Sequence, residues 1–183
     1  MQAIADPWIL FPLFIAQIGL VFWLASRVMQ MSAAQATGVF MLYSALTGVT
    51  LSFVFLAYTA ASLTSTFLVT AGTFGAMSFY GYTTKRDLTA MGSFLFMGLI
   101  GIIIASVVNI FIGSTMVQFV VSVLGVIIFV GLTAYDTQQI KNMYYAADSG
   151  EVVTKKSIMG ALRLYLDFLN MFLFLLQLFG NRN

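Results

Sequence analysis

Cysteine and histidine are both absent from this chain of 183 residues, and charged residues make up only 8% of it. Without these two residue types, disulfides, Cys/His metal sites, haem ligation by histidine and the triads that depend on histidine or cysteine are all excluded. We expect no resident cofactor. Proton chemistry near neutral pH would have to come from carboxyl groups, lysines or tyrosines in unusual surroundings.

Hydrophobic residues are what the chain has in excess, at 61% of its length. A soluble domain carries about 25% charged residues, so the composition predicts an all-α polytopic membrane protein. Six apolar runs lie near the roughly 20 residues that a helix needs to cross a bilayer. They cover approximately residues 8–26, 36–60, 65–82, 91–112, 116–135 and 157–179. We predict that residues 1–183 form a single bundle whose apolar last helix is enclosed by the others.

The basic residues give the expected orientation, because loops on the cytoplasmic side are enriched in lysine and arginine. One side of the bundle would carry Arg27, Lys85, Arg86, Lys141, Lys155 and Lys156, and the other side only Arg182. The first side is therefore expected to be cytoplasmic, in a bacterial inner (plasma) membrane. Both chain ends would then face outward, which suggests a helix preceding this segment. The net charge of +2 is too small to favour nucleic acid as a partner; membrane lipids are expected.

The longest predicted loop, residues 141–156, is too short to fold as a domain, and there is no phosphate-binding glycine loop. The chain is therefore not expected to be an ATP-driven pump by itself. Small residues at helical spacing predict close helix packing rather than a site. They occur at Ser44/Gly48/Ser52, Ala71/Gly75, Gly72/Ala76 and Gly101/Ala105.

Two aspartates, Asp136 and Asp167, lie at the edge of or inside predicted spans. An ionised carboxylate in hydrocarbon costs several kcal/mol, so such a residue indicates a functional site. The polar segment between the last two spans centres near Glu151, with Asp136 15 residues before it and Asp167 16 residues after it. In an antiparallel hairpin the two carboxyl groups would lie at the same depth, so we expect them to form a pair.

Several neighbours could support the pair. Thr133 and Gln139 flank Asp136, and Asn170 follows Asp167, each three residues away, so that their side chains could donate hydrogen bonds. A simpler interpretation is that Asp136 caps its helix in water while Asp167 pairs with Arg163, four residues earlier on the same helical face. If the carboxyl groups are close, they share one proton and form a pH-sensitive latch.

The segments 131–141 (GLTAYDTQQIK), 164–170 (LYLDFLN) and 178–180 (LFG) resemble the signature of the Bax inhibitor-1 family. The connection at residues 81–88 (GYTTKRDL) resembles its bacterial branch, and the resemblance extends over essentially the whole chain. It implies a seven-helix bundle with a central last helix, of which this chain holds helices two to seven.

The resemblance also implies a function, that of a pH-sensitive calcium leak channel whose di-aspartyl sensor matches Asp136 and Asp167. These two residues would bind calcium weakly. Gln17 stands where some members carry a glutamate on the presumed ion path, and Arg27 matches a latch arginine only approximately. Arg163 is an added cation that would hold Asp167 ionised and compete with calcium.

Two other functions stay open. The chain could be a non-conducting modulator that docks on a membrane-bound ATP-dependent protease, as the bacterial branch is linked to such a protease. It could also be an intramembrane aspartyl protease, since Tyr135-Asp136 fits the first half of that pattern. The second half should read Gly-x-Gly-Asp, but residues 164–167 read LYLD, and a Pro-Ala-Leu element is absent. We therefore expect that the protein is not an enzyme.

Overall fold

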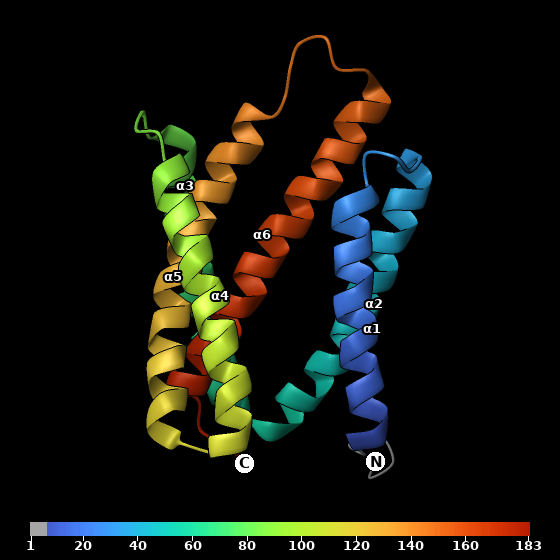
Figure 1. Cartoon of the computed structure of the whole chain (residues 1–183). Helices are drawn as coiled ribbons and strands as arrows, with labels where there is room; N and C mark the ends of the chain where they lie inside the picture. Colours follow the sequence, from blue (N-terminus) through green and yellow to red (C-terminus); the bar gives the residue numbers. More distant parts are fainter. Residues whose placement is uncertain (1–6) are drawn as a thin grey trace. The chain divides into compact units, whose positions relative to one another are not determined.

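The computed structural model describes residues 7–183, with the side chains of residues 12, 13 and 15–183, and this part of the chain forms six helices (Figure 1). In chain order they are α1 (Pro7–Arg27), α2 (Ala33–Ala57), α3 (Ala60–Thr83), α4 (Thr89–Ile112), α5 (Thr115–Asn142) and α6 (Gly150–Phe179). The predicted all-α fold and the number of helices are confirmed. The predicted outward N-terminus begins with residues that lie outside the described part.

Four of the helices are long and apolar enough to cross a membrane, namely α2, α4, α5 and α6. The chain is therefore a polytopic membrane protein. In α1 the described residues give a shorter apolar helix, Ile15–Arg27, and α3 is not among the four. Membrane crossing by α1 and α3 stays a prediction.

The largest difference from the predicted boundaries lies between the last two helices. Helix α5 continues to Asn142 and α6 already begins at Gly150, so the predicted loop over residues 141–156 is wrong and the connection is only residues 143–149. Apolar runs mark the part of a helix inside hydrocarbon, whereas the backbone hydrogen bonds of the helix continue into polar surroundings.

By its contacts the described chain divides into two compact units. The first holds α1, α2, the α5–α6 connection and the start of α6 to Leu162, together with residues 182 and 183. The second holds residues 60–143, which include α3, α4 and α5, and residues 163–181 of α6 and its end. The single bundle and the enclosed last helix stay predictions.

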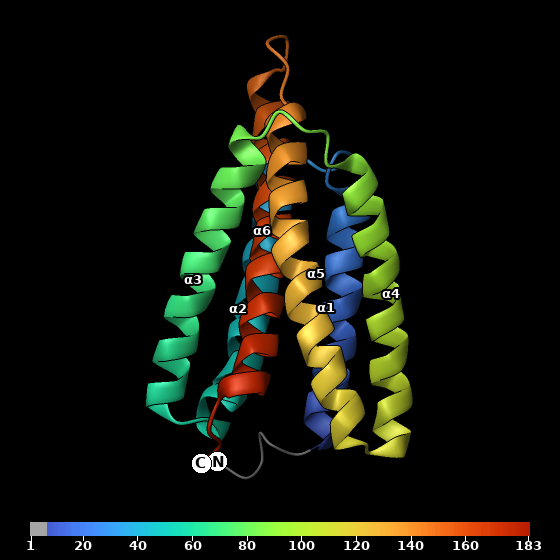
Figure 2. The same cartoon turned by 90° about the vertical axis from the view of Figure 1, so that its left-hand side faces the viewer.

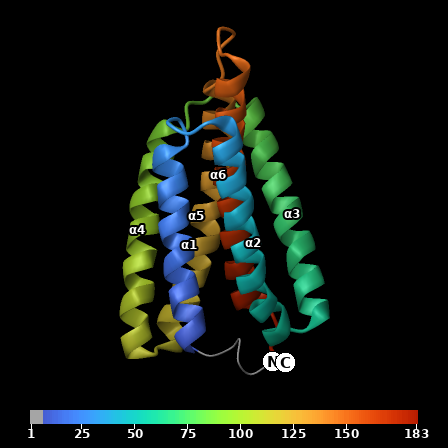
Figure 3. The ribbon, with the colours of Figure 1, turned by 90° about the vertical axis from the view of Figure 1, so that its right-hand side faces the viewer.

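In the first unit, α1 and α2 lie side by side and run in opposite directions (Figure 3). Helix α2 begins with a capping box, in which the Ser32 hydroxyl accepts from the Gln35 N–H at 3.2 Å and the Gln35 side chain accepts from the Ser32 N–H at 3.0 Å. These bonds satisfy backbone groups that a helix start leaves open, and they fix the turn after α1.

In the second unit, α5 lies between α3 and α4 (Figure 2). The turn from α4 to α5 is made by Gly113, whose φ of 66° is left-handed, and by Ser114, whose hydroxyl accepts from the Val117 N–H at the start of α5. The buried core joins α4, α5 and α6. It consists of Leu95, Ile102, Val121, Ile128, Phe129, Leu132, Met171 and Leu175.

Glycines bring the helices of the second unit close together, but not the ones predicted. A Cβ at Gly81 would lie 2.1 Å from the backbone oxygen of Ala134 on α5, and a Cβ at Gly92 would lie 2.5 Å from the Tyr135 ring. By contrast, a Cβ at Gly75 or Gly101 would meet nothing within 4 Å, and the same holds at Gly48 and Gly72. Small-residue spacing alone does not say which helix face meets a neighbour.

Candidate functional site: a buried aspartate pair

Asp136 on α5 and Asp167 on α6 come together within the second unit. Their relative exposures are 5% and 3%, so both are buried. The two carboxyl groups lie within hydrogen-bonding reach of each other. Ionised carboxylates only accept hydrogen bonds, so a bond between these groups requires that one of them carry a proton.

The antiparallel register of α5 and the later half of α6 produces this contact. At one end of the register, Ser122 bonds the side chain of Gln177, and these residues lie 28 before and 27 after residue 150. At the other end, Asp136 lies 14 residues before residue 150 and Asp167 lies 17 after it. The pairs are therefore nearly equidistant from residue 150, which is the start of α6 and not the middle of the connection.

Arg163 adds a cation at the exposed edge of the pair. Its Nη1 lies 3.4 Å from Oδ1 of Asp136, across the two helices, and its side chain is 43% exposed. The expected ion pair between Arg163 and Asp167 is thus replaced by one with Asp136. Arg163 is also the charged side chain that acts electrostatically on both carboxyl groups.

One oxygen of the pair is left without a donor. Oδ2 of Asp167 is buried and accepts no hydrogen bond from any donor in the described part of the chain. Burying an unsatisfied carboxylate oxygen is costly, and the cost is greatest when the group is ionised. A proton shared with Asp136 is the simplest way to satisfy this oxygen, because it turns one carboxyl group into a donor.

The predicted supporting donors have other partners. The Thr133 hydroxyl donates to the backbone oxygen of Phe129 at 2.7 Å, and the Asn170 amide donates to the backbone oxygen of Leu166 at 2.8 Å. Both therefore bond carbonyls of their own helices, four residues earlier. The single hydroxyl proton of Thr133 is used in this way, whereas the Asn170 amide keeps a second N–H, so its support of Asp167 stays a prediction. Gln139 is half-buried, and among the described residues no hydrogen bond joins it to either aspartate.

Aromatic rings join α6 to α3 at the residue that follows Asp167. The ring of Phe168, which follows Asp167, lies 5.6 Å from the Phe67 ring and 5.3 Å from the Phe74 ring, in edge-on contacts. Such contacts add to the apolar area that the rings bury. They hold this part of α6 against α3.

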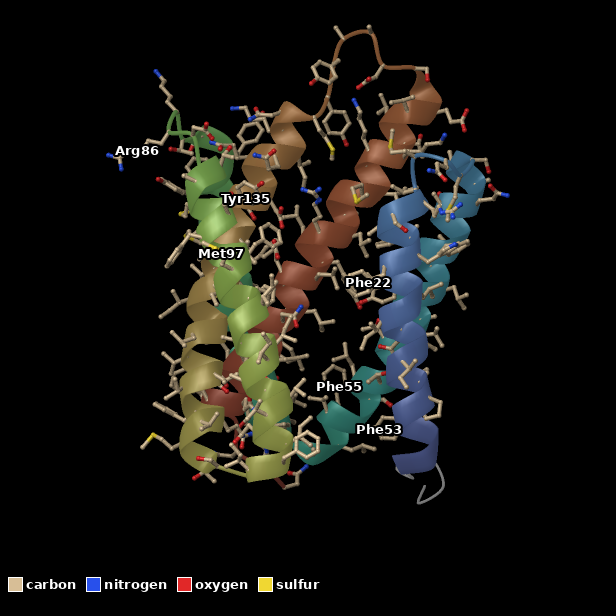
Figure 4. The ribbon with its side chains drawn as sticks, viewed as in Figure 1. Phe22, Phe53, Phe55, Arg86, Met97 and Tyr135 are labelled. Atoms are coloured by element: carbon tan, nitrogen blue, oxygen red, sulfur yellow. The ribbon has the colours of Figure 1, made fainter. Side chains whose placement is uncertain are left out.

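A second aromatic contact holds the neighbour of Asp136 toward α4. Tyr135 lies on α5 with its ring 6.1 Å from that of Phe96, edge-on, and Gly92 leaves the room that the ring needs (Figure 4). Helices α3, α4 and α6 are thus all packed on α5 near the pair.

Comparison with known proteins agrees with this fold. A family model described as inhibitor of apoptosis-promoting Bax1 matches residues 1–183. The chain belongs to the Bax inhibitor-1 family. The inner membrane protein YbhL of Escherichia coli (strain K12) is 58% identical over 172 residues, which cover 93% of this chain and 74% of YbhL.

Two further relatives come from distant bacteria. An uncharacterized protein of Borreliella burgdorferi is 52% identical over 171 residues, covering 93% of this chain and 74% of the relative. An uncharacterized membrane protein of Streptococcus pyogenes serotype M1 is 42% identical over 178 residues, covering 97% and 77%. The chain is therefore a bacterial member of the Bax inhibitor-1 family, and the predicted family is confirmed.

Gln17 and Arg27, which were predicted as a possible ion path or latch, lie in the first unit. Gln17 is buried between α1 and α2, where its amide donates to the Thr50 hydroxyl and lies 3.4 Å from the Leu46 backbone oxygen. Arg27 ends α1 and is exposed, and its Nη1 is 3.4 Å from the side-chain oxygen of Gln30. Gln17 thus joins two helices, while Arg27 makes a local contact.

For metal binding, the pair offers few ligands. Within the described residues there is no group of three or more His, Cys, Asp or Glu side chains that could hold an ion. Calcium takes six to eight oxygen ligands, so two carboxyl groups could supply only a minor part of its shell. The pair by itself does not form a complete calcium site.

Gln138 was not predicted as a site residue, yet it joins separate elements of the fold, which Thr133 and Asn170 do not. It is buried, its amide donates to the Arg86 backbone oxygen at 2.8 Å, and its oxygen accepts from the Leu88 N–H at 2.9 Å. It therefore clamps the α3–α4 connection to α5, two residues beyond Asp136. In the sequence, Gln138 is distinguished by its place in the segment 131–141 that resembles the family signature.

Proposed function

We propose that this member of the Bax inhibitor-1 family is a weak cation leak, with calcium as a permeant ion, that opens when the Asp136–Asp167 pair loses its shared proton. The observation that supports this most is the contact between two buried carboxyl groups, one of which has an oxygen without a donor. A structural ion pair would not require two acids in contact.

The charge balance explains how a proton would close the path. With one proton on the pair, its charge of −1 is balanced by Arg163, and the shared proton bridges α5 and α6. Without that proton, two unit charges about 4 Å apart repel by about 4 kcal/mol at an effective dielectric constant of about 20. This repulsion favours separation of the helices or entry of a cation.

Weak binding is compatible with conduction, because a permeant ion must also leave its site. Two carboxylates and neighbouring backbone oxygens would attract a divalent cation without replacing its whole hydration shell. Calcium is in this account the transported ion and not a resident metal. We further propose a location in the bacterial inner membrane with the basic connections on the cytoplasmic side.

Calcium flux into liposomes that contain the purified chain, measured from pH 5 to pH 9, tests the proposal. We expect flux to rise with pH in the wild type, and to lose this pH dependence in Asp136→Asn and Asp167→Asn. Glu151→Gln is a matched control, because Glu151 is an exposed acid that pairs only locally with Lys155 at 3.2 Å. Flux that is absent at every pH, or a full pH response in both aspartate variants, would contradict the mechanism and favour the docking modulator.

A further inference from the structure

A depression of about 260 Å³ lies at one end of the second unit, between the α3–α4 connection at residues 84–87 and the end of α5. From α5 it is lined by Gln138, Lys141 and Asn142. It lies apart from the aspartate pair and takes no part in the proposed conduction. Its lining is mostly polar and basic, which distinguishes it from the apolar surface of the neighbouring helices.

Three cations surround this depression, namely Lys85, Arg86 and Lys141, against one anion, Asp87. The Asp87 carboxylate is turned toward the start of α4, where it accepts from the N–H of Thr89 at 2.9 Å and from its hydroxyl at 2.6 Å. The depression therefore has a net positive charge, and its one acid already has partners. Arg86 projects outward from the connection (Figure 4).

The backbone that carries these cations is held in place, while the side chains of Lys85 and Arg86 are exposed. Gln138 holds the α3–α4 connection through its bonds to Arg86 and Leu88. Lys141 is fixed on the other side, because its Nζ donates to the Tyr82 backbone oxygen at 2.8 Å and lies 4.9 Å from the centre of the Tyr82 ring. An ammonium group has three donors, so two stay available to a ligand.

The chemistry of the site favours an amphiphile that carries a phosphate. Lysine and arginine are the usual donors to phosphate oxygens, and the exposed side chains of Lys85 and Arg86 can turn toward a ligand in the depression. The helices that the connection joins carry exposed apolar side chains: Phe79, four residues before the end of α3, is 71% exposed, and Phe94, five residues after the start of α4, is 69% exposed. Basic pockets at the ends of membrane-spanning helices suit lipid headgroups, and exposed aromatic side chains suit the acyl chains below them.

We propose that this depression binds the headgroup phosphate of an anionic phospholipid through Lys85, Arg86 and Lys141. The acyl chains would lie along the exposed faces of α3 and α4. The bound lipid would join the α3–α4 connection to α5 from outside, as Gln138 does from inside. Inorganic phosphate carries the same group that these cations would bind, so it is measured separately from the lipid.

The test uses the full chain in a neutral detergent, titrated with phosphatidylglycerol, with phosphatidylcholine of the same acyl chains, and with inorganic phosphate. Native mass spectrometry counts the bound lipids, and thermal melting records stabilisation. The variant is Lys85→Gln/Arg86→Gln, because both side chains are exposed, whereas Lys141 also contacts α3. The control, Arg27→Gln/Lys155→Gln, removes two positive charges outside the depression.

We expect phosphatidylglycerol to bind the wild type and the control, and to bind the Lys85/Arg86 variant about thirty-fold more weakly, given the usual contribution of two cations near an anionic surface. An equal loss in the control would show diffuse charge attraction and overturn the proposal. Equal binding of phosphatidylcholine would overturn it as well. Stabilisation by inorganic phosphate alone, equal to that by the lipid, would assign the depression to free phosphate and not to a lipid.

Discussion

Arg163 Nη1 lies 3.4 Å from Asp136 Oδ1 on the neighbouring helix, although Asp167 is only four residues further along the helix of Arg163 itself. The guanidinium is partly exposed while the carboxylate is buried. The pair of acids thus has its counter-ion at the edge of the site and not within it. One proton and one arginine together cancel the charge of the two carboxylates.

Replacing Arg163 is expected to move the pH response upward. A nearby cation favours the ionised form of an acid, so its removal makes the pair hold the shared proton to higher pH. For Arg163→Gln we expect the midpoint of calcium flux against pH to rise by about one pH unit. This corresponds to a loss of about 1.4 kcal/mol of interaction between the arginine and the ionised pair, which is the order of magnitude of a partly exposed ion pair. Arg163→Lys keeps the charge and should stay nearer the wild type. A fall in the midpoint of Arg163→Gln would contradict this account.

The two aspartates should differ when each is replaced by asparagine. In Asp167→Asn the new amide can donate to Asp136 without a shared proton, and the Arg163–Asp136 ion pair stays in place. In Asp136→Asn this ion pair is lost. At pH 8 we therefore expect a melting temperature at or above the wild type for Asp167→Asn and below it for Asp136→Asn, by several degrees. The higher melting temperature of Asp167→Asn relative to the wild type should become smaller at pH 5. A lower melting temperature of Asp167→Asn at pH 8 would contradict the account in which the unsatisfied Oδ2 of Asp167 destabilises the ionised pair.

Gln138 is expected to stabilise the α3–α4 connection. In Gln138→Ala the buried Leu88 N–H loses its partner, at a cost of about 1–3 kcal/mol, and the Arg86 backbone oxygen loses its side-chain partner as well. We expect faster tryptic cleavage after Lys85 and Arg86. Gln139→Ala is the matched control, because Gln139 is the next residue and is only half-buried. Equal cleavage rates in the two variants would exclude the clamp.

Close packing of α3 on α5 leaves no room for a side chain at Gly81. A Cβ there would lie 2.1 Å from a backbone oxygen, so Gly81→Ala must push the helices apart, at a cost of about 1–3 kcal/mol. In the same helix, Gly75→Ala meets nothing within 4 Å and should be neutral or slightly stabilising, because alanine favours helices over glycine. Thermal unfolding in detergent measures the difference, and equal melting temperatures would contradict the contact.

The sequence could predict the helices because apolar length determines which segments cross a bilayer. It also indicated that Asp136 and Asp167 share a register, and the structure brings them together. However, Glu151, which was expected at the centre of a loop, lies in the first turn of α6, so the register is centred on the start of a helix. Where a helix ends outside hydrocarbon is decided by local backbone bonds, which hydropathy does not record.

Side-chain partners were harder to predict. A threonine inside a helix readily bonds the carbonyl four residues earlier, as Thr133 does, so its distance from Asp136 in sequence was misleading. The partner of Arg163 depends on which helix faces it, and the close glycines Gly81 and Gly92 depend on the same tertiary information. The clamp by Gln138 joins residues about 50 positions apart, which no local pattern reveals.

The α5–α6 connection should depend on the charge of Asp148. Its carboxylate accepts from Lys156 Nζ at 2.7 Å and from the Tyr145 N–H at 2.9 Å, and these bonds hold the pKa of Asp148 below its usual value of 3.8. An acid with a lowered pKa in the folded state stabilises the fold above its ordinary pKa and loses this contribution as the pH falls through the lowered value.

At pH 7 we therefore expect faster amide hydrogen exchange at residues 143–149 in Asp148→Asn than in the wild type, with Glu151→Gln unchanged. Once the pH has fallen below the lowered pKa of Asp148, the wild type and Asp148→Asn should converge, because the carboxyl group is then protonated. A difference that persists unchanged at that pH would show that charge is not what orders the connection.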